Sequence, residues 1–293
     1  MKLKPVLKDI VWGGYRLAGE YGKSDDPNKK IAESWELAAH KNGVNIIENG
    51  EHAGKLLSEV WGAEKFPLLI KFIDAKQKLS VQVHPGDDYA KKFEGEFGKT
   101  EMWYIVDANP GAQIVYGLNG DYSRRDLQSL INAGKFEDCL NYITVKPGDV
   151  YFIPAGLVHA IGAGILIAEI QQNSDTTYRF YDYNRLGDDG KPRELHIQQA
   201  LDVCIKTKTE YVNPCKGDVL AECEYFKARK IELAGERFEF LPDSFASVIC
   251  LGGGGEIIYG NEKYTIKKGD SYFIPAGAAF NVTGTLEFIL TGV

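Results

Sequence analysis

A histidine placed directly after a tight turn is the first feature of this sequence that could carry chemistry. His159 lies near the end of Val145–Gly162, VKPGDVYFIPAGLVHAIG. Pro147-Gly148-Asp149 and Pro154-Ala155-Gly156 predict chain reversals on either side of a short β-prone run, Tyr151–Ile153. Such a turn can hold an imidazole at the mouth of a small barrel. His159 is therefore a candidate metal ligand, because imidazole nitrogen commonly binds divalent ions.

A second histidine ends a predicted strand. In Leu79–Pro85, LSVQVHP, the alternation of apolar and polar residues places Gln82 and His84 on one face and the intervening valines on the other. A lone histidine at such a place is more often a hydrogen-bonded group at the surface or in the core than a metal ligand. The presence of His159 in a similar strand-and-turn context favours a site that contains both imidazoles.

A carboxylate opens the next strand-like run. Glu101 follows Lys99 and Thr100 and precedes Trp103–Val106. An acidic residue at a strand start is ordinarily solvated, so Glu101 matters only together with the histidines. Two imidazoles, this carboxylate and the amide of Gln82 would suit a divalent ion such as Zn²⁺, which accepts nitrogen and oxygen ligands. The remaining histidines lie in polar contexts without such turns and are interpreted as structural: His40, His52 and His196.

A polar and aromatic segment follows the His159 motif. Gln171–Tyr183, QQNSDTTYRFYDY, is dense in groups that can bind a sugar, and it contains Asp175 and Arg179. Arg179 is a permanently charged, planar donor that suits a carboxylate, a phosphate or a developing enediolate oxygen. The alternative is an ion pair between Asp175 and Arg179 on a strand edge, without a chemical role.

The His159 motif is repeated near the end of the chain. Residues 267–278, KKGDSYFIPAGA, are identical to residues 146–157, KPGDVYFIPAGL, at nine of twelve positions. An internal repeat of this kind implies two copies of one structural unit. The second copy has Phe280 at the place of His159. We therefore expect one copy to carry the chemistry and the other to bind no metal.

Periodicity and turn residues predict a mainly β chain with a few short helices. Phe66–Val83 is typical of two hydrophobic strands around a polar turn. Helical patterns cover Gly54–Gly62, Asp87–Glu94, Asp121–Leu140 and His196–Lys206. Ser123 can cap the third of these helices, and Gly134 can end it. Gly252–Gly255 is interpreted as a hairpin turn, because no helix follows it.

The composition excludes several classes of protein. The 293 residues leave room for two domains. A net charge of −7 argues against general binding to nucleic acid or membrane surfaces, although an anionic substrate can still bind locally. The five cysteines form no CxxC pair, and no segment has the length of a membrane span. We expect a cytoplasmic protein with reduced thiols; nothing in the sequence assigns an oligomeric state.

Four motifs in order resemble the type I mannose-6-phosphate isomerases in their short bacterial form, a family of the cupin superfamily. The motifs are Gln82–Pro85, Gly98–Glu101, Pro154–Gly162 and Gln172–Arg179. The likeness begins at Trp12-Gly13-Gly14 and covers almost the whole chain. The resemblance implies a mainly β fold of two cupin-type jelly-roll barrels with a small helical insertion around residues 121–141. It also implies an N-terminal catalytic domain, 1–200, and a degenerate C-terminal domain, 207–293.

The resemblance further implies a metal-dependent aldose–ketose isomerase that interconverts mannose 6-phosphate and fructose 6-phosphate through a cis-enediol. The family pattern assigns one Zn²⁺ per chain to Gln82, His84, Glu101 and His159. It assigns substrate and catalytic roles to Arg179, Lys99 and Asp175. Two alternatives stay open at this point: another metal cupin enzyme, such as an oxygenase or a different sugar isomerase, and a non-catalytic bicupin that binds sugars.

Overall fold

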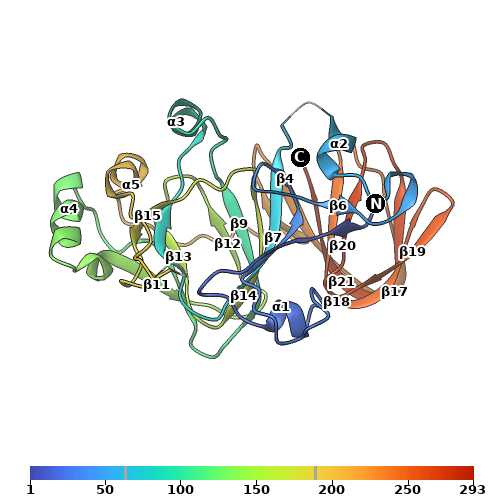
Figure 1. Ribbon diagram of the computed structural model, residues 1–293, viewed down its shortest axis with the longest axis horizontal. Helices are drawn as coiled ribbons and strands as arrows, with labels where there is room; N and C mark the ends of the chain where they lie inside the picture. Colours follow the sequence, from blue (N-terminus) through green and yellow to red (C-terminus); the bar gives the residue numbers. More distant parts are fainter. Residues whose placement is uncertain (63–64, 188–189) are drawn as a thin grey trace. The chain divides into compact units, whose positions relative to one another are not determined.

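The computed structural model describes residues 1–62, 65–187 and 190–293 (Figure 1). The chain forms two compact units, and neither is one continuous stretch of sequence. Unit 1 comprises Met1–Lys8, Tyr15–Phe72 and Pro214–Val293, and unit 2 comprises Asp9–Gly14 and Ile73–Asn213. Strands dominate both units, which confirms the mainly β fold expected from the sequence.

Unit 2 contains two antiparallel sheets. One has the strand order β11–β10–β13–β8–β15, and in the other β9 pairs with both β12 and β14. The two end strands of the five-stranded sheet, β11 and β15, do not pair with each other within the described residues. The strands are β8 Val81–Val83, β9 Glu101–Ala108, β10 Gln113–Leu118, β11 Leu140–Thr144, β12 Val150–Ile153, β13 His159–Ile161, β14 Ile165–Gln172 and β15 Tyr178–Tyr181. The strand before them, β7 Leu68–Ala75, spans the division of the chain between the units.

The register of the five-stranded sheet aligns three residues that the sequence singled out. Gln82 pairs with His159 on one neighbouring strand and with Arg179 on the other. Because directly opposed residues share a face of a sheet, all three side chains lie on the same face. On the other face, Val81 and Val83 are fully buried in an apolar core. The alternation predicted for this strand is confirmed.

Within the described residues, three short α-helices and a 3₁₀ helix, η2 (Phe136–Cys139), accompany these sheets. The first, α3 (Asp87–Phe93), has two aspartates in its first turn, next to the positive end of the helix dipole. The second, α4 (Arg124–Asn132), begins at Ser123, which forms a reciprocal capping box with Asp126. The third, α5 (Ile197–Val203), is shorter than predicted and packs beside α4 (Figure 1). In the part of the chain that the structure describes, no helix is long and apolar enough to cross a membrane.

Unit 1 combines the N-terminal segment with the C-terminal residues. Its main sheet has the order β16–β17–β21–β18–β19, and β20 also pairs with β18. These strands are β16 Val219–Glu222, β17 Lys227–Phe240, β18 Ala246–Tyr259, β19 Glu262–Lys267, β20 Ser271–Ile274 and β21 Phe280–Gly292. The N-terminal elements are β1 Leu3–Lys4, β2 Val6–Lys8, α1 Arg16–Gly19, β3 Glu33–Leu37, β4 Ala39–His40, β5 Gly43–Val44, β6 Ile46–Ile47, a 3₁₀ turn Gly50–His52, and α2 Leu57–Trp61.

The glycine run Gly252–Gly255 is not a hairpin turn, and that prediction was wrong. The run lies inside β18, which pairs with β21 on both sides of it. A Cβ atom on Gly255 would lie 1.9 Å from the backbone oxygen of Thr283, and one on Gly253 would lie 2.1 Å from that of Thr285. Glycine is required here because two backbones approach too closely for any side chain.

The two copies of the repeated motif form the same turn. In each copy, the N–H of the motif glycine donates to the backbone oxygen of a residue on a neighbouring strand. The N–H of that strand residue donates to the backbone oxygen of the aspartate that directly follows the glycine. The residues are Gly148, Ile105 and Asp149 in unit 2, and Gly269, Cys250 and Asp270 in unit 1. Hydrogen bonding and sequence therefore identify the same equivalent positions.

Candidate metal centre and active site

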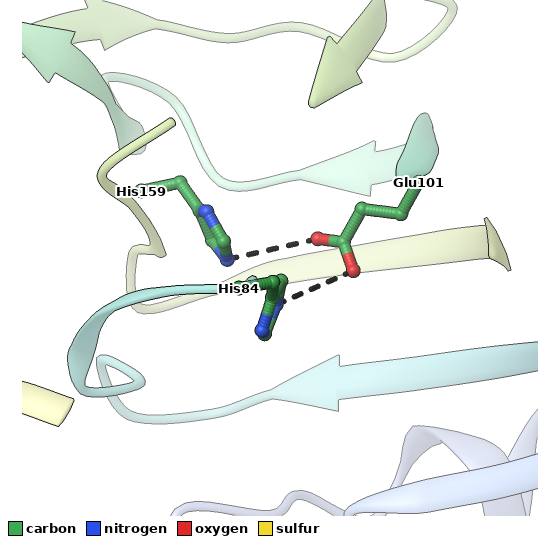
Figure 2. A group of neighbouring side chains, drawn as sticks. All are labelled: His84, Glu101 and His159. Atoms are coloured by element: carbon green, nitrogen blue, oxygen red, sulfur yellow. Dashed lines mark ion pairs between the residues drawn. The ribbon is translucent and has the colours of Figure 1, made fainter. Parts of the chain in front are cut away.

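Two histidines and a glutamate from different strands converge in unit 2 (Figure 2). His84 directly follows β8, Glu101 opens β9 and His159 opens β13. Each residue offers one ligand atom, these atoms lie within 4.8 Å of one another, and all three residues are buried. Oε2 of Glu101 is 3.5 Å from Nε2 of His84, and Oε1 is 3.7 Å from Nε2 of His159. This combination of donors is typical of a divalent-metal site.

The backbone fixes which nitrogen each imidazole presents to the centre. Nδ1 of His84 donates to the carbonyl oxygen of Thr176 at 2.9 Å, and Nδ1 of His159 donates to that of Leu157 at 2.9 Å. Because a carbonyl can only accept, the proton is on Nδ1 and each Nε2 keeps its lone pair. Burial, and next the charge of Lys99, lower the pKa of His159 to about 3. The ring is therefore neutral near pH 7, which is the form that binds metals.

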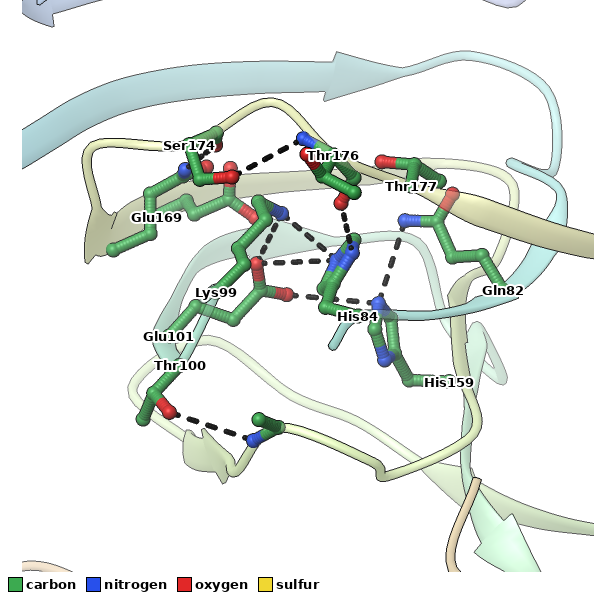
Figure 3. A network of polar contacts seen from close by, with 12 residues as sticks. Gln82, His84, Lys99, Thr100, Glu101, His159, Glu169, Ser174, Thr176 and Thr177 are labelled. Carbon is green, nitrogen blue, oxygen red and sulfur yellow. Dashed lines mark hydrogen bonds and ion pairs between the residues drawn. The ribbon is translucent and has the colours of Figure 1, made fainter. Parts of the chain in front are cut away.

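Lys99 brings a buried positive charge to the same residues (Figure 3). Its Nζ lies 2.8 Å from Nε2 of His84 and forms an ion pair with Oε2 of Glu101. The side chain of Lys99 is 5% exposed and that of Glu101 is fully buried. A carboxylate removed from water in this way requires a compensating charge or several donors. Lys99 provides that compensation.

Gln82 completes the face that carries the two histidines. Its Nε2 lies 3.3 Å from Nε2 of His159, and its Oε1 accepts a hydrogen bond from the hydroxyl of Ser80 at 3.1 Å. The amide therefore contacts one of the predicted metal ligands directly. Of the four predicted ligands, the structure brings His84, Glu101 and His159 into one cluster and places Gln82 against its edge.

Arg179 lies on β15, opposite Gln82. Burial, and next the neighbouring charge of Arg193, lower the pKa of Arg179 below its ordinary value. Its Nε atom is buried and has no hydrogen-bond partner among the described residues. The backbone N–H of Arg179 donates to Nδ1 of His196 at 3.4 Å, so this histidine, interpreted from the sequence as structural, contacts a predicted site residue.

Asp175 lies in the loop between β14 and β15. The next residue, Thr176, supplies the carbonyl oxygen that accepts from His84, and the N–H of Thr176 donates to the hydroxyl of Ser174 at 3.3 Å (Figure 3). The backbone next to Asp175 therefore contacts His84, a member of the candidate metal site, and Asp175 is partly buried.

One glycine connects the segments that hold both histidines. Gly156 donates its N–H to the carbonyl oxygen of His84 at 2.8 Å and accepts the N–H of Ile205 at 2.7 Å. Its φ is +89°, a conformation that favours glycine. The turn before His159 is thereby hydrogen-bonded to His84, directly after β8, and to Ile205, after α5.

Sequence reasoning missed two buried residues of this site. The indole Nε1–H of Trp103 is 3.0 Å from Oε1 of Glu101 and 3.0 Å from Oε1 of Glu169. Glu169 is 3% exposed and lies on β14, directly opposite Trp103. A signal was present in the sequence, because Glu169 is an acidic residue in the apolar run Ile165–Ile170.

Two family models match the chain. Residues 1–109 match the model "phosphomannose isomerase type I, catalytic domain", and residues 217–293 match "mannose-6-phosphate isomerase, cupin domain". The mannose-6-phosphate isomerase ManA of Bacillus subtilis is 40% identical over 98% of this chain and 97% of its own length. This chain belongs to the type I mannose-6-phosphate isomerase family.

Further comparisons agree with membership of the mannose-6-phosphate isomerase family. The mannose-6-phosphate isomerase of Streptococcus mutans is 39% identical over 98% of this chain and 96% of its own length. The crystal structure of the mannose 6-phosphate isomerase from Bacillus subtilis has a TM-score of 0.89 and 36% identity, and the match covers 100% of this chain and 99% of that one. The resemblance seen in the motifs is confirmed.

Proposed function

We propose that this protein interconverts mannose 6-phosphate and fructose 6-phosphate. The observation that carries the proposal is the buried cluster of His84, Glu101 and His159, in a chain that matches mannose-6-phosphate isomerases over nearly its whole length. A phosphorylated hexose is therefore the proposed substrate. The arginine on the same sheet face as Gln82 is suited to a group that carries negative charge.

We further propose one Zn²⁺ per chain, held by Gln82, His84, Glu101 and His159. The donor set fits this ion, because two neutral imidazoles with free Nε2 lone pairs face one carboxylate. Gln82 can bind a cation only through its oxygen, and a half-turn of its amide would point Oε1 toward His159. When bound, the ion would polarise a sugar oxygen as a Lewis acid.

The residues around this cluster suit proton transfer between neighbouring carbons. Isomerisation through a cis-enediol requires a base, a group that moves protons between two oxygens, and positive charge beside the developing oxyanion. We assign the charge-stabilising role to Arg179, which is partly buried on the face of Gln82 and His159. Lys99 and Asp175 are the proposed proton carriers, since Lys99 contacts the cluster and Asp175 precedes the residue that anchors His84.

The proposed roles of the two domains follow the sequence repeat. The proposed catalytic cupin domain lies within residues 1–200 and has a helical insertion around 121–141, and the proposed degenerate cupin domain comprises residues 207–293. Residues 1–8 and 15–72, although inside the first range, belong to the same compact unit as the C-terminal residues. The same turn occurs in both copies, which supports two jelly-roll units of common design. Five free cysteines support a cytoplasmic location.

A coupled assay tests this function. Protein loaded with Zn²⁺ should convert mannose 6-phosphate to fructose 6-phosphate, and a chelator should abolish turnover until Zn²⁺ is added back. In D₂O, deuterium should appear at C2 of mannose 6-phosphate or C1 of fructose 6-phosphate, because a base exchanges the proton with solvent. Metal-replete protein that isomerises no phosphosugar would refute the proposal, and product without any label would remove the proton-carrier roles.

A further inference from the structure

The indole N–H of Trp103 is shared between two buried carboxylates. One of them, Glu101, belongs to the proposed metal site, and the other, Glu169, lies beside it. Trp103 is 1% exposed, and its Nε1 lies 3.0 Å from an oxygen of Glu101 and 3.0 Å from an oxygen of Glu169. Its ring also packs against His159, with centroids 5.4 Å apart and planes at 79°. Trp103 therefore contacts two of the residues proposed as metal ligands.

The fold does not require this arrangement, as the second copy of the repeat demonstrates. On β9, Trp103 pairs with Tyr151 and Glu169. On β18 of unit 1, the equivalent residue is Val248, which pairs with Tyr272 and Leu290. Both Val248 and Leu290 belong to the apolar core of unit 1.

Burying a carboxylate where an aliphatic residue serves equally well is unfavourable unless the carboxylate has another use. Leu290 fills its position with apolar surface, whereas Glu169 places a second acidic group beside Glu101. Both carboxylates lie within hydrogen-bond distance of the Trp103 indole N–H, which is a donor that Val248 does not have. The pair of Trp103 and Glu169 is thus explained by the site rather than by packing.

We propose that Trp103, anchored by Glu169, is a positioning residue for Glu101. One hydrogen bond at Oε1 fixes the rotation of the carboxylate, so that Oε2 stays directed toward His84. Partners outside the ligand shell orient metal ligands in this way, and their loss typically lowers metal affinity about 10- to 100-fold. The inference rests on the metal site proposed above.

The test compares two conservative variants. Trp103→Phe keeps an aromatic ring against His159 but removes the N–H. Trp35→Phe is the matched control, because Trp35 is also buried and also donates its Nε1–H to a glutamate two residues earlier, Glu33, at 2.7 Å. Affinity for Co²⁺ and Zn²⁺ is measured by competition with a chromophoric chelator, and the visible spectrum of bound Co²⁺ reports the geometry of its ligands.

We expect Trp103→Phe to bind metal about 10- to 100-fold more weakly than the wild type and to change the Co²⁺ spectrum. Trp35→Phe should match the wild type in both measurements. Trp103→Phe with wild-type affinity and spectrum overturns the positioning role, while a wild-type protein that binds no divalent ion overturns the metal site itself. Should Trp103→Phe not fold, Glu169→Leu removes the anchor with the residue that unit 1 uses, and unchanged affinity in that variant is the refuting result.

Discussion

Replacing Gly156 by alanine should damage the proposed metal site through the backbone alone. Its φ of +89° is unfavourable for a residue with a Cβ, by roughly 1–2 kcal/mol. A Cβ there would also lie 2.9 Å from the backbone oxygen of Val203, closer than real Cβ atoms approach, so the chain must shift. Forced overpacking of this kind costs about 1–3 kcal/mol more. The shift acts on the turn that is hydrogen-bonded to His84 and leads to His159.

Gly277 is the natural control, because it holds the same position in the second copy of the motif. Its φ is +71°, and a Cβ there would meet nothing within 4 Å. Gly277→Ala should therefore lower the free energy of unfolding by roughly 1–2 kcal/mol. Gly156→Ala should lower it by roughly 2–5 kcal/mol, the sum of both effects.

Urea denaturation and metal titration separate the two variants. Gly156→Ala should also weaken metal binding and reduce kcat/KM by about 10- to 100-fold, because small displacements of positioned groups are costly. Gly277→Ala should retain the metal affinity and the kcat/KM of the wild type. The reasoning fails if the two alanine variants are equally stable and equally active, since the contact with the segment after α5 would then be irrelevant.

Three further changes have distinct outcomes. Arg179→Ala should cut turnover by about 10²- to 10³-fold and leave the metal content unchanged, as measured by kinetics and metal analysis. Arg179→Lys should restore only part of the lost turnover, because lysine supplies the charge but not the planar donor group. Burial raises the pKa of Asp182, but the hydrogen bonds and charges of Arg193 and Arg185 outweigh it and lower the pKa below its ordinary value. The stability that Asp182 contributes is thus present above pH 4 and lost in stronger acid, so Asp182→Asn should destabilise the protein at pH 6 and progressively less below pH 4. Phe280→His should leave one metal per chain, because Ala246 occupies the position equivalent to Glu101.

Residues whose role depends on neighbours in sequence were predicted well. The strand alternation around Gln82 and the turn before His159 are local patterns, and both appear in the structure as expected. Glu101 was identified because it opens a strand-like run and belongs to Gly98–Glu101, one of the motifs that carry the family resemblance. The Ser123 cap of α4 is local in the same sense.

Features that depend on strand register were missed. Glu169 meets Trp103 only because β14 and β9 pair with that particular alignment, and a shift of one residue would put Glu169 on the opposite face. The glycine run in β18 was misassigned for the same reason, since the oxygen that excludes a Cβ from Gly255 belongs to Thr283 on another strand. Local composition could not distinguish a turn from a close approach of two strands.

The two copies of the repeat separate what the fold demands from what the chemistry demands. The shared turn, with its glycine and aspartate hydrogen bonds, is kept in both units and therefore belongs to the fold. Four positions change together from polar or aromatic to apolar or small: Glu101 to Ala246, Trp103 to Val248, His159 to Phe280 and Glu169 to Leu290. Three of these residues lie within hydrogen-bond or ring contact of the fourth, Trp103. A set that is present together in one unit and absent together from the other is what a single functional site requires, and Trp103 lies at its centre.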